Sequence, residues 1–597
     1  MNKKLKRALA STVVLAMAAS AVPLSASADD ENTIVPIVDG DTVLNEWKFD
    51  FGAADTEPAE GYTRVSPDIN FVQNTGGEYQ YGFLGTEAED YNLTNRYDGW
   101  TTQNGQVIEL DAGGGTGLND AIGVVGAGGT GENEGKDIFG NEADVYYPVR
   151  FALKVEDDTY YRIKATVTTL DPEQPATASL YTERKHPIYT EKTIPAGETV
   201  TETFSVRVTP IYYQKSSPTG EIPDEMVTVG VLGENAALAS VEIQQVKTIP
   251  TIWVLGDSTV TDGNTTLPFF QLQNFTGVGT GLTKFLRRDY AVVNEGEGGL
   301  DANDRYHFEM VAERIKPGDY MYVEYGHNHK DDGPSGYKAA LEKYYTTSHN
   351  AGANLLIVSP VQSINSWNET DLKWNDRFGG DDNFEGAGRS FVEEKIEAGA
   401  TDIAFVNLTE TSVAFVDKVT EDNENSQDAA KYYYQTDKGG ATDASHPNDL
   451  GAENFAYCFF EAAKAVTDDP QKTVVAPIIE NMSDETPILV SQEIMAGGVG
   501  GDAWPQYIVP TTEKYPVVIN DVVFNDDGTV SHVDVTTRAA EIDLSSYGVI
   551  VITIYNADGS EKGTIYAVDQ VDNSTGYGPQ TISRFTGDTV LADGDTY

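Results

Sequence analysis

Thr251-Ile252-Trp253-Val254-Leu255-Gly256-Asp257-Ser258-Thr259 is the stretch that decides how the middle of this chain folds. The run of apolar and β-branched residues predicts a buried strand, and Gly256-Asp257 predicts a tight turn directly after it. Open α/β sheets hold their ligands at the carboxyl ends of such strands. Ser258 is therefore a candidate nucleophile, provided that a base and an anion-stabilising pocket can reach it.

The sequence after this stretch alternates between strand-like and helical patterns. Strands are expected at 251–255, 291–294, 320–325, 354–359 and 403–408. Helices are expected at 267–288, 304–315, 335–350, 388–399 and 449–466. This alternation predicts an α/β unit, with a doubly wound parallel sheet covered by helices on both faces.

The regions on either side of this unit have β patterns. Short alternating runs such as 160–167 and 202–208 are separated by turn residues and predict a two-sheet β-sandwich or jelly roll. Short β patterns return after about residue 485, for example at 548–555, and a length of 597 residues fits about three domains. The expected plan is a signal peptide at 1–28, an N-terminal β-sandwich domain at 29–247, an α/β domain at 248–470 and a C-terminal β domain at 471–597.

The first 28 residues have the pattern of an export signal. Four cations within residues 3–7 precede an apolar stretch at 8–24, and Ala26-Ser27-Ala28 forms a small-x-small cleavage site. The apolar stretch is too short and too rich in Ala and Ser to be a comfortable membrane span, and no second one occurs. We therefore expect a secreted, extracellular bacterial protein.

The chain is strongly acidic. Its formal net charge is −54, and it becomes −58 when the four cations of the signal segment are removed. Such a surface repels nucleic acid and anionic lipid, so we expect neither as a partner, and no obligate protein partner is evident. The single cysteine, Cys458, excludes an intramolecular disulfide framework and is expected to pack in the core.

Four blocks of polar residues accompany the predicted strands and the last helix. Gly299 follows the second predicted strand, Asn328 follows the third, and Asp443 and His446 precede the last helix. Because the loops after parallel strands open at one edge, these groups can converge on Ser258. We predict Ser258 as nucleophile, His446 as base and Asp443 as the acid that orients it. The backbone N–H groups of Ser258 and Gly299 and the side-chain amide of Asn328 are the predicted oxyanion hole.

Together these blocks resemble the SGNH (GDSL-type) hydrolase superfamily. Gly256-Asp257-Ser258-Thr259, Gly326-His327-Asn328 and the Asp443/His446 loop are most similar to its rhamnogalacturonan acetylesterase-like branch of carbohydrate esterases. The resemblance covers about residues 251–466. It implies a flavodoxin-like three-layer fold and deacylation of carbohydrate esters, with no metal or other cofactor required. The upstream region, which opens with Trp47-Lys48-Phe49-Asp50-Phe51-Gly52, resembles galactose-binding-like sandwich modules that precede such esterases.

Some segments depart from this branch. His329 stands where the branch usually has Asp, and Leu300-Asp301 follows Gly299 where it often has Gly-Arg-Ser. Both changes alter the expected polarity of the cleft. The segment from Trp367 to Gly386 is interpreted as a substrate loop, and His327 and Trp367 as substrate-binding residues.

Other interpretations of these residues remain open. His327-Asn328-His329 with Asp331-Asp332 could bind zinc, but no third ligand has a fixed position, so His327 is expected to form structural hydrogen bonds. Asp381-Asp382-Asn383 could hold a structural calcium. The glycine-rich stretch at 113–129 is expected to be a loop without phosphate-binding function. Aromatic residues of the first β region could stack on sugars, although core packing is favoured for each of them: Trp47, Tyr79, Tyr81 and Trp100.

The sequence favours a secreted serine esterase that removes acetyl groups from a plant cell-wall polysaccharide, either rhamnogalacturonan/pectin or xylan, through an acyl-enzyme. One alternative is a polysaccharide-binding protein whose middle unit is inactive, which the intact set of polar blocks disfavours. Another is a lipid or thioester hydrolase on the same scaffold, which would need an apolar acyl groove.

Overall fold

The fold is taken from a computed structural model. It describes residues 34–71, 79–85, 100–102, 110–114, 120–124, 147–210, 224–263, 265–267, 275–286, 289–329, 333–436, 442–490, 517–525, 527–537, 551–557, 560–567, 578–587, 589–592 and 595. The expected signal peptide lies outside these ranges. From Ile37 onward the chain forms one compact unit by its internal contacts. None of the helices in the described part of the chain is long and apolar enough to cross a membrane.

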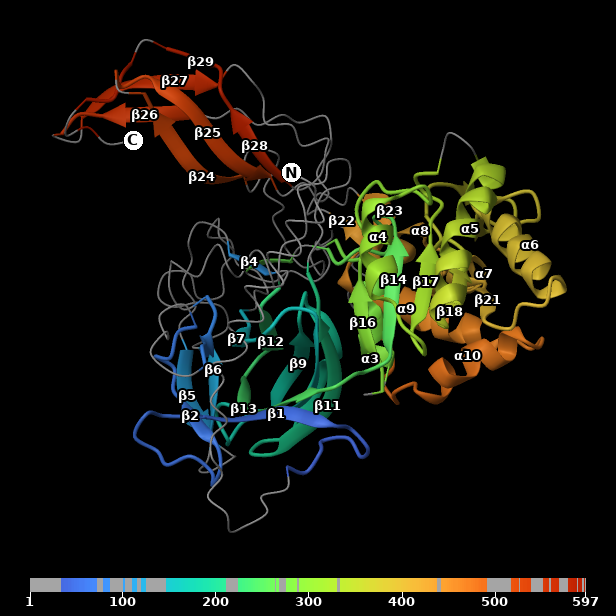
Figure 1. Cartoon of the computed structure of the whole chain (residues 1–597), viewed down its shortest axis with the longest axis horizontal. Helices are drawn as coiled ribbons and strands as arrows, with labels where there is room; N and C mark the ends of the chain where they lie inside the picture. The colour runs from blue at the N-terminus through green and yellow to red at the C-terminus, as the bar shows by residue number, and fades with distance from the viewer. Residues whose placement is uncertain are drawn as a thin grey trace, which may run out of the picture. The chain divides into compact units, whose positions relative to one another are not determined.

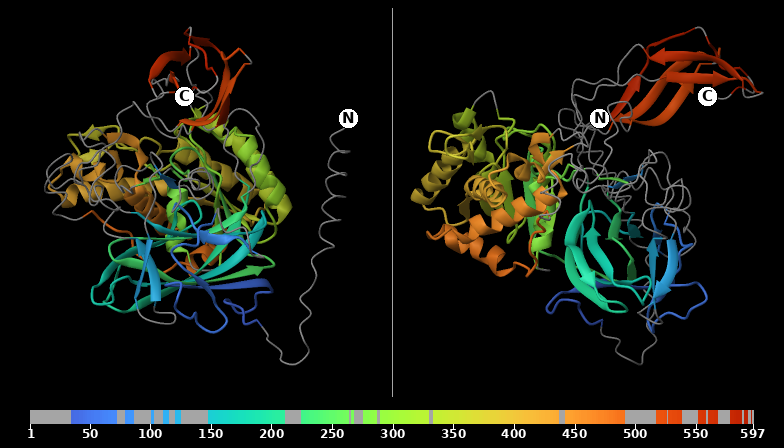
Figure 2. Two further views of the ribbon diagram at one scale, coloured as in Figure 1. Left: turned by 90° about the vertical axis from the view of Figure 1, so that its left-hand side faces the viewer. Right: turned by 180° about the vertical axis from the view of Figure 1, so that it is seen from behind.

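Two sheets build the first region (Figures 1 and 2). The larger sheet contains, in spatial order, β11 (Thr199–Val208), β8 (Thr159–Thr169), β13 (Ala236–Val246), β1 (Val43–Phe51) and β2 (Thr63–Val65), with β6 (Asp120–Val124) and β5 (Leu110–Gly114) attached through β13. The smaller sheet contains β10 (His186–Ile194), β9 (Ala176–Thr182), β12 (Met226–Leu232), β7 (Val149–Lys154) and β3 (Tyr81–Phe83). Because side chains alternate along each strand, one face of each sheet contributes to a shared core that includes Phe49, Ile163, Phe151 and Val229.

The middle region contains the parallel sheet that the sequence predicts. Its strands are, in spatial order, β16 (Ala291–Asn294), β14 (Thr251–Gly256), β17 (Tyr320–Glu324), β18 (Asn354–Val358) and β21 (Ile403–Val406). Every neighbouring pair is parallel. Numbered by their order along the chain, the strands lie in the order 2-1-3-4-5. The predicted mixed α/β architecture with a parallel sheet is therefore confirmed.

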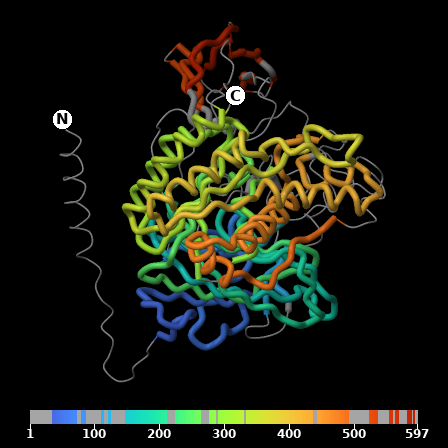
Figure 3. Tube along the Cα trace, turned by 90° about the vertical axis from the view of Figure 1, so that its right-hand side faces the viewer, coloured from blue at the N-terminus to red at the C-terminus, as the bar shows by residue number. Residues whose placement is uncertain are grey.

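Helices cover both faces of this sheet. Ile252 and Val254 pack in one core with α3 (Val278–Phe285), α7 (Leu408–Asp422), α9 (Asp449–Lys464) and α10 (Gln471–Glu480). Trp253 and Leu255 point the other way, into a core with α4 (Tyr306–Arg314), α5 (Gly333–Ala351) and α6 (Phe384–Glu397). α5 and α6 lie side by side (Figure 3). This burial on both faces explains why consecutive residues within these strands are apolar, rather than every second one.

Two small sheets form the last region. One contains β24 (Val517–Phe524), β25 (Val530–Thr537) and β28 (Gly578–Ile582), and the other β26 (Val551–Tyr555), β27 (Glu561–Ala567) and β29 (Phe585–Thr586). Their pairings are antiparallel. They share a small core that includes Val533 and Ile554, so the β pattern expected after residue 485 is present among the described residues.

Several predicted boundaries are wrong. Among the described residues of the helix expected at 267–288, only α3 is helical, and β15 (Thr265–Leu267) pairs with β4 (Trp100–Thr102) at the start of that segment. α6 begins four residues before the predicted start at 388, because the side chain of Asn383 caps it by accepting from the N–H of Phe384. The strand expected at 403–408 ends at Val406, because Asn407 caps the unpredicted helix α7.

The expected glycine-rich loop and the expected end of the α/β region also need correction. Asp120–Val124 within the glycine-rich stretch forms β6, where Gly123 lies close to Leu170. α10 begins directly after Pro470, and its side chains pack in the same core as α9. That core continues to Val490, well beyond the boundary expected at residue 470.

Candidate active site

Ser258 lies in a tight turn that is possible only because residue 256 is glycine. A Cβ on Gly256 would lie 2.5 Å from Val260 Cγ2 and 2.6 Å from the carbonyl oxygen of Glu324. The chain can therefore turn sharply after β14. Ser258 is half-buried and lies at the carboxyl ends of the neighbouring strands β14 and β17. This is the edge at which the sequence predicts the site.

Asp257 fixes this turn against the next loop. Its Oδ1 accepts from Thr259 N at 3.0 Å and from Thr259 Oγ1 at 2.8 Å. Its Oδ2 accepts from the backbone N–H groups of Gly326 at 3.4 Å and His327 at 3.2 Å. One buried carboxylate thus joins the loop after β14 to the loop after β17, which carries Asn328.

The structure brings Ser258, His446 and Asp443 together across 188 positions of sequence. Nε2 of His446 lies 2.8 Å from Ser258 Oγ, and its Nδ1 lies 2.6 Å from Asp443 Oδ2. The sequence predicts a loop here, but Asp443 and His446 lie on the short strand β23 (Thr442–Pro447), which pairs with β22 (Tyr434–Thr436). With Nδ1 donating to the carboxylate, Nε2 is free to accept the serine proton.

Asp443 is held in its ionised form by its neighbours. Burial raises the pKa of this carboxyl, but the bond to His446, the charge of His446 and the backbone N–H groups of Ser445 and His446 outweigh it. The net pKa lies below the ordinary value. Oδ1 takes the two backbone bonds, at 2.9 Å and 3.2 Å, which leaves Oδ2 for the imidazole.

Further contacts hold the imidazole in place. The ring of Phe275 meets the ring of His446 edge-on, with centroids 4.9 Å apart. Asn448, fully buried, caps α9 and donates to the carbonyls of Tyr432 and Tyr434. His446 therefore lies between a packed aromatic ring and an anchored helix start.

The predicted oxyanion donors lie on neighbouring loops. Gly299 has a φ of +72°, which favours glycine, and follows β16, the strand beside β14. Asn328 follows β17, the strand on the other side of β14. Among the described residues the buried Nδ2 of Asn328 has no hydrogen-bond partner. A buried amide without an acceptor costs about 1–3 kcal/mol, so this group is suited to a partner that arrives with substrate.

His327 is buried and lies 3.0 Å through Nε2 from the carbonyl of Val361. Burial lowers its pKa to about 4, so the ring is neutral at pH 7 and Nε2 donates to that carbonyl. This is the structural hydrogen bond expected for His327, and its role towards substrate stays a prediction.

Glu324 lies under the site as a buried neutral acid. Its Oε1 accepts from Val361 N at 2.9 Å, and Tyr322 Oη lies 2.5 Å from Oε2. Burial, reinforced by the charge of Asp257, raises its pKa from 4.5 to about 8.

The raised pKa predicts a dependence of stability on pH. Between pH 4.5 and about pH 8, Glu324 keeps its proton in the folded protein but has released it in the unfolded chain. The free energy of unfolding is therefore highest at low pH and decreases as the pH rises through this window. Glu324→Gln should mimic the neutral acid, so its Tm relative to wild type is expected to rise from about pH 5 to about pH 8. Thermal melts across this range test it, with the exposed Glu394→Gln as control. An unchanging Tm difference would contradict the assignment.

The remaining predicted residues have mixed outcomes. Trp367 lies in β19 (Trp367–Asn368), half-buried against Trp374 of β20 (Lys373–Trp374) with ring centroids 5.2 Å apart, and its role towards substrate stays a prediction. His329 is buried between the rings of Tyr337 and Phe384. Cys458 is buried in the core, as expected.

The metal interpretations find no support in the described ranges. Asp331 and Asp332 lie outside them, and no group of three or more His, Cys, Asp or Glu side chains within them is placed to hold a metal ion. In the turn that could hold a calcium, Asp381 pairs with Arg389 and Asn383 caps α6.

Sequence reasoning missed two residues that organise the site. Asp257 appears in the sequence only as part of a motif, and Asn294 as the last residue of a strand. Asn294 donates to the carbonyl of Val260 at 2.7 Å and accepts from Gly296 N at 3.0 Å. Asn294 could have been recognised as a polar residue that ends an otherwise apolar strand, and Asp257 as a polar residue in the turn directly after one.

No protein-family model matches the chain, and a comparison with curated proteins finds no match. Solved structures similar to it include the Bacillus subtilis protein YxiM, at 18% identity over 70% of this chain and 98% of that one, with a TM-score of 0.32. The salicylyl-acyltransferase SsfX3 from a tetracycline biosynthetic pathway matches at 15% over 54% and 83%, with a TM-score of 0.28. Axe2, an acetylxylan esterase from Geobacillus stearothermophilus, matches at 17% over 36% and 93%, with a TM-score of 0.25. Similarities at such TM-scores do not assign a function to this chain.

Proposed function

We propose that this chain is a serine carboxylic-ester hydrolase. The observation that carries the proposal is the chain of hydrogen bonds from Asp443 through His446 to Ser258, with 2.6 Å and 2.8 Å between the bonded atoms. A serine hydroxyl becomes a nucleophile when an oriented imidazole can take its proton, and these contacts meet that requirement.

The reaction proceeds in two steps, acylation and deacylation of Ser258. Ser258 Oγ attacks the ester carbonyl carbon while its proton passes to His446 Nε2, and the carbonyl oxygen becomes an oxyanion. The tetrahedral intermediate then expels the alcohol, whose oxygen receives that proton from His446, and an acyl-serine remains. Water attacks the acyl-serine with His446 again as base, and the carboxylic acid leaves as Ser258 recovers its proton. Asp443 stays ionised throughout and stabilises the imidazolium.

The oxyanion is stabilised by the N–H groups of Ser258 and Gly299 and by the amide of Asn328. Asn328→Ala is expected to lower kcat by about 10²- to 10³-fold with little change in KM, because the amide acts only when charge develops. Since the amide lacks a partner among the described residues, the same variant should keep or raise Tm. Steady-state kinetics and thermal melts test this. A fall in Tm with unchanged kcat would assign Asn328 a structural role instead.

We further propose an SGNH-type carbohydrate acetylesterase that is secreted after cleavage before Asp29. The strand order 2-1-3-4-5, which flavodoxin-like sheets share, supports the fold, and the two facing sheets of the first region support a β-sandwich module. The substrate would be an acetylated polysaccharide of plant cell walls. The N-terminal residue of protein recovered from the culture medium checks the export signal.

The test is hydrolysis by the full chain. We expect release of p-nitrophenol from p-nitrophenyl acetate and of acetate from acetylated pectin or xylan, and covalent labelling of Ser258 by an organophosphate. Preference for long-chain p-nitrophenyl esters would instead favour the lipid hydrolase. Absence of both hydrolysis and labelling would overturn the proposal.

A further inference from the structure

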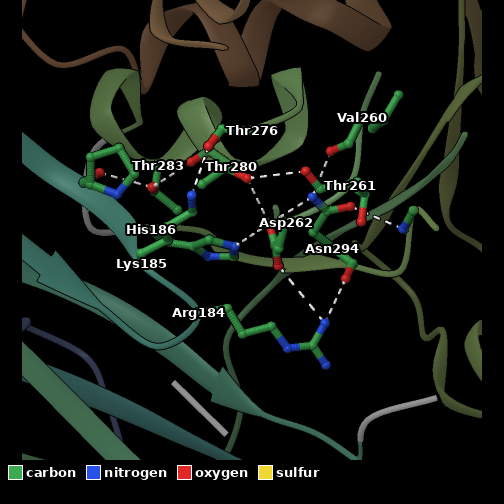
Figure 4. Close-up of polar contacts among 12 residues, drawn as sticks. Arg184, Lys185, His186, Val260, Thr261, Asp262, Thr276, Thr280, Thr283 and Asn294 are labelled. Carbon is green, nitrogen blue, oxygen red and sulfur yellow. Dashed lines mark hydrogen bonds and ion pairs between the residues drawn. The ribbon is translucent and has the colours of Figure 1, made fainter. Parts of the chain in front are cut away.

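A tight turn of the first β region contacts the segments that carry the proposed site. It joins β9 to β10, and three consecutive cationic or ionisable residues follow along it: Arg184 and Lys185 in the turn and His186 at the start of β10 (Figure 4). Glu183 and Lys185 have φ angles of +44° and +54°, in the left-handed region that residues other than glycine rarely adopt.

Two of these side chains contact Asp262, four residues after Ser258 (Figure 4). Nε2 of His186 lies 2.9 Å from Asp262 Oδ1, and Nη1 of Arg184 lies 3.8 Å from Oδ2. Arg184 also donates to the carbonyl of Asn294 at 3.0 Å. Through these contacts the β9–β10 turn links the loop after β14 to the end of β16.

Asp262 and Asn294 connect these contacts to the proposed oxyanion donors. Asn294 Nδ2 donates both to Asp262 Oδ1 at 2.7 Å and to the carbonyl of Val260 at 2.7 Å. Its Oδ1 accepts from the N–H of Gly296, three residues before Gly299. A shift of Asp262 would thus be transmitted to the loops of both Ser258 and Gly299.

The third side chain reaches the histidine side of the site. Nζ of Lys185, 2% exposed, lies 2.7 Å from Thr276 Oγ1 and 3.3 Å from Asp449 Oδ1. Thr276 donates its N–H to the carbonyl of Pro447, the residue after His446. Phe275, the residue before Thr276, packs edge-on against the imidazole of His446.

The buried carboxylate of Asp262 needs these contacts to compensate its charge. The side chain of Asp262 is only 6% exposed, and a buried carboxylate that loses its cationic partners becomes an uncompensated charge. Burial raises the pKa of Asp262, but the charge and bond of His186, the charge of Arg184 and the amide of Asn294 bring it below the ordinary value. Loss of the donor from His186 should therefore move the carboxylate towards water or another donor.

We infer that the β9–β10 turn is a positioning element that holds the loops of Ser258 and His446 in register, through His186 on Asp262 and Lys185 on Thr276 and Asp449. This inference rests on the proposed esterase function. It makes Arg184, Lys185 and His186 positioning residues, since none of them touches the reacting atoms.

The test compares two substitutions of His186 in the full chain. His186→Leu removes the donor to Asp262 and is expected to lower kcat for p-nitrophenyl acetate by about 10- to 100-fold, since displacement of about 1 Å has such effects. His186→Gln keeps an N–H donor and should retain kcat within about threefold. KM should change by less than about twofold in both. If His186→Leu does not fold, Lys185→Met provides the same test of kcat, because Lys185 contacts the segments beside His446.

Thr190→Val is the matched control. Thr190 lies on β10 of the same hairpin and bonds Lys284 and Glu453 across the same interface, away from the Ser258 and His446 loops. It should lower Tm and leave kcat unchanged. Wild-type kcat in folded His186→Leu and Lys185→Met would overturn the inference while leaving the esterase proposal intact. A wild-type chain without Ser258-dependent hydrolysis would overturn both.

Discussion

Ser258→Ala is expected to lower kcat by about 10⁴- to 10⁶-fold, the largest effect of any single substitution in this chain. The variant has no nucleophile, so no acyl-serine can form, and the residual rate comes only from substrate bound beside the oxyanion donors. Among the described residues the Ser258 hydroxyl bonds only His446. The residue is half-buried, so losing one oxygen should leave Tm nearly unchanged. Steady-state hydrolysis of p-nitrophenyl acetate with thermal melts measures both.

Ser390→Ala provides the control for this experiment. Ser390 is also half-buried, but its hydroxyl bonds Lys338 on α5. It should keep wild-type kcat. Combining Ser258→Ala with His446→Ala should cost little more than either change alone, because the two residues act as one unit. An active Ser258→Ala variant, or losses that multiply in the double variant, would contradict the shared mechanism.

The parallel sheet was predictable because burial leaves a direct trace in sequence. Each strand lies between two layers of helices, so 252–255 and 291–293 are apolar without interruption, and the predicted boundaries of β14 and β16 are correct to within one residue. Helices were harder to place. α7 begins two residues after β21 ends, and a side-chain cap on Asn407 decides that boundary, not periodicity.

The extension of the α/β core past Pro470 was not predictable from local pattern. Asp468-Asp469-Pro470 has the composition of a domain end, yet α10 follows and packs Val474 and Ile478 against the sheet. What keeps it there is tertiary contact with α9 and β21, which no local window of sequence contains.

The convergence of the candidate residues was predictable from the sequence, but the contacts that support them were not. Ser258, Gly299 and Asn328 follow strands that are easy to find, so their common edge follows from the topology. The bonds of Asp257 to the β17 loop and of His186 to Asp262 join segments about 70 positions apart or more, and both side chains resemble ordinary turn residues in sequence.

Asp443→Asn is expected to lower kcat by about 10³- to 10⁴-fold. Oδ1 of Asp443 accepts from the N–H groups of Ser445 and His446, so an asparagine would keep its carbonyl oxygen there. Its NH₂ group would then face His446 Nδ1 and donate to it. The imidazole would carry its proton on Nε2, and it could no longer accept the proton of Ser258 Oγ.

This orientation makes asparagine at least as damaging as alanine at the same position. Asp443→Ala leaves a partly exposed site where water can accept from Nδ1, since the Asp443 side chain is 42% exposed. Asp428→Asn, at an acid that is 47% exposed and pairs with Lys431 three residues on, is the matched control and should keep wild-type kcat. Rates of p-nitrophenyl acetate hydrolysis rank the three variants. Activity of Asp443→Asn within about tenfold of wild type would show that the carboxylate does not set the tautomer.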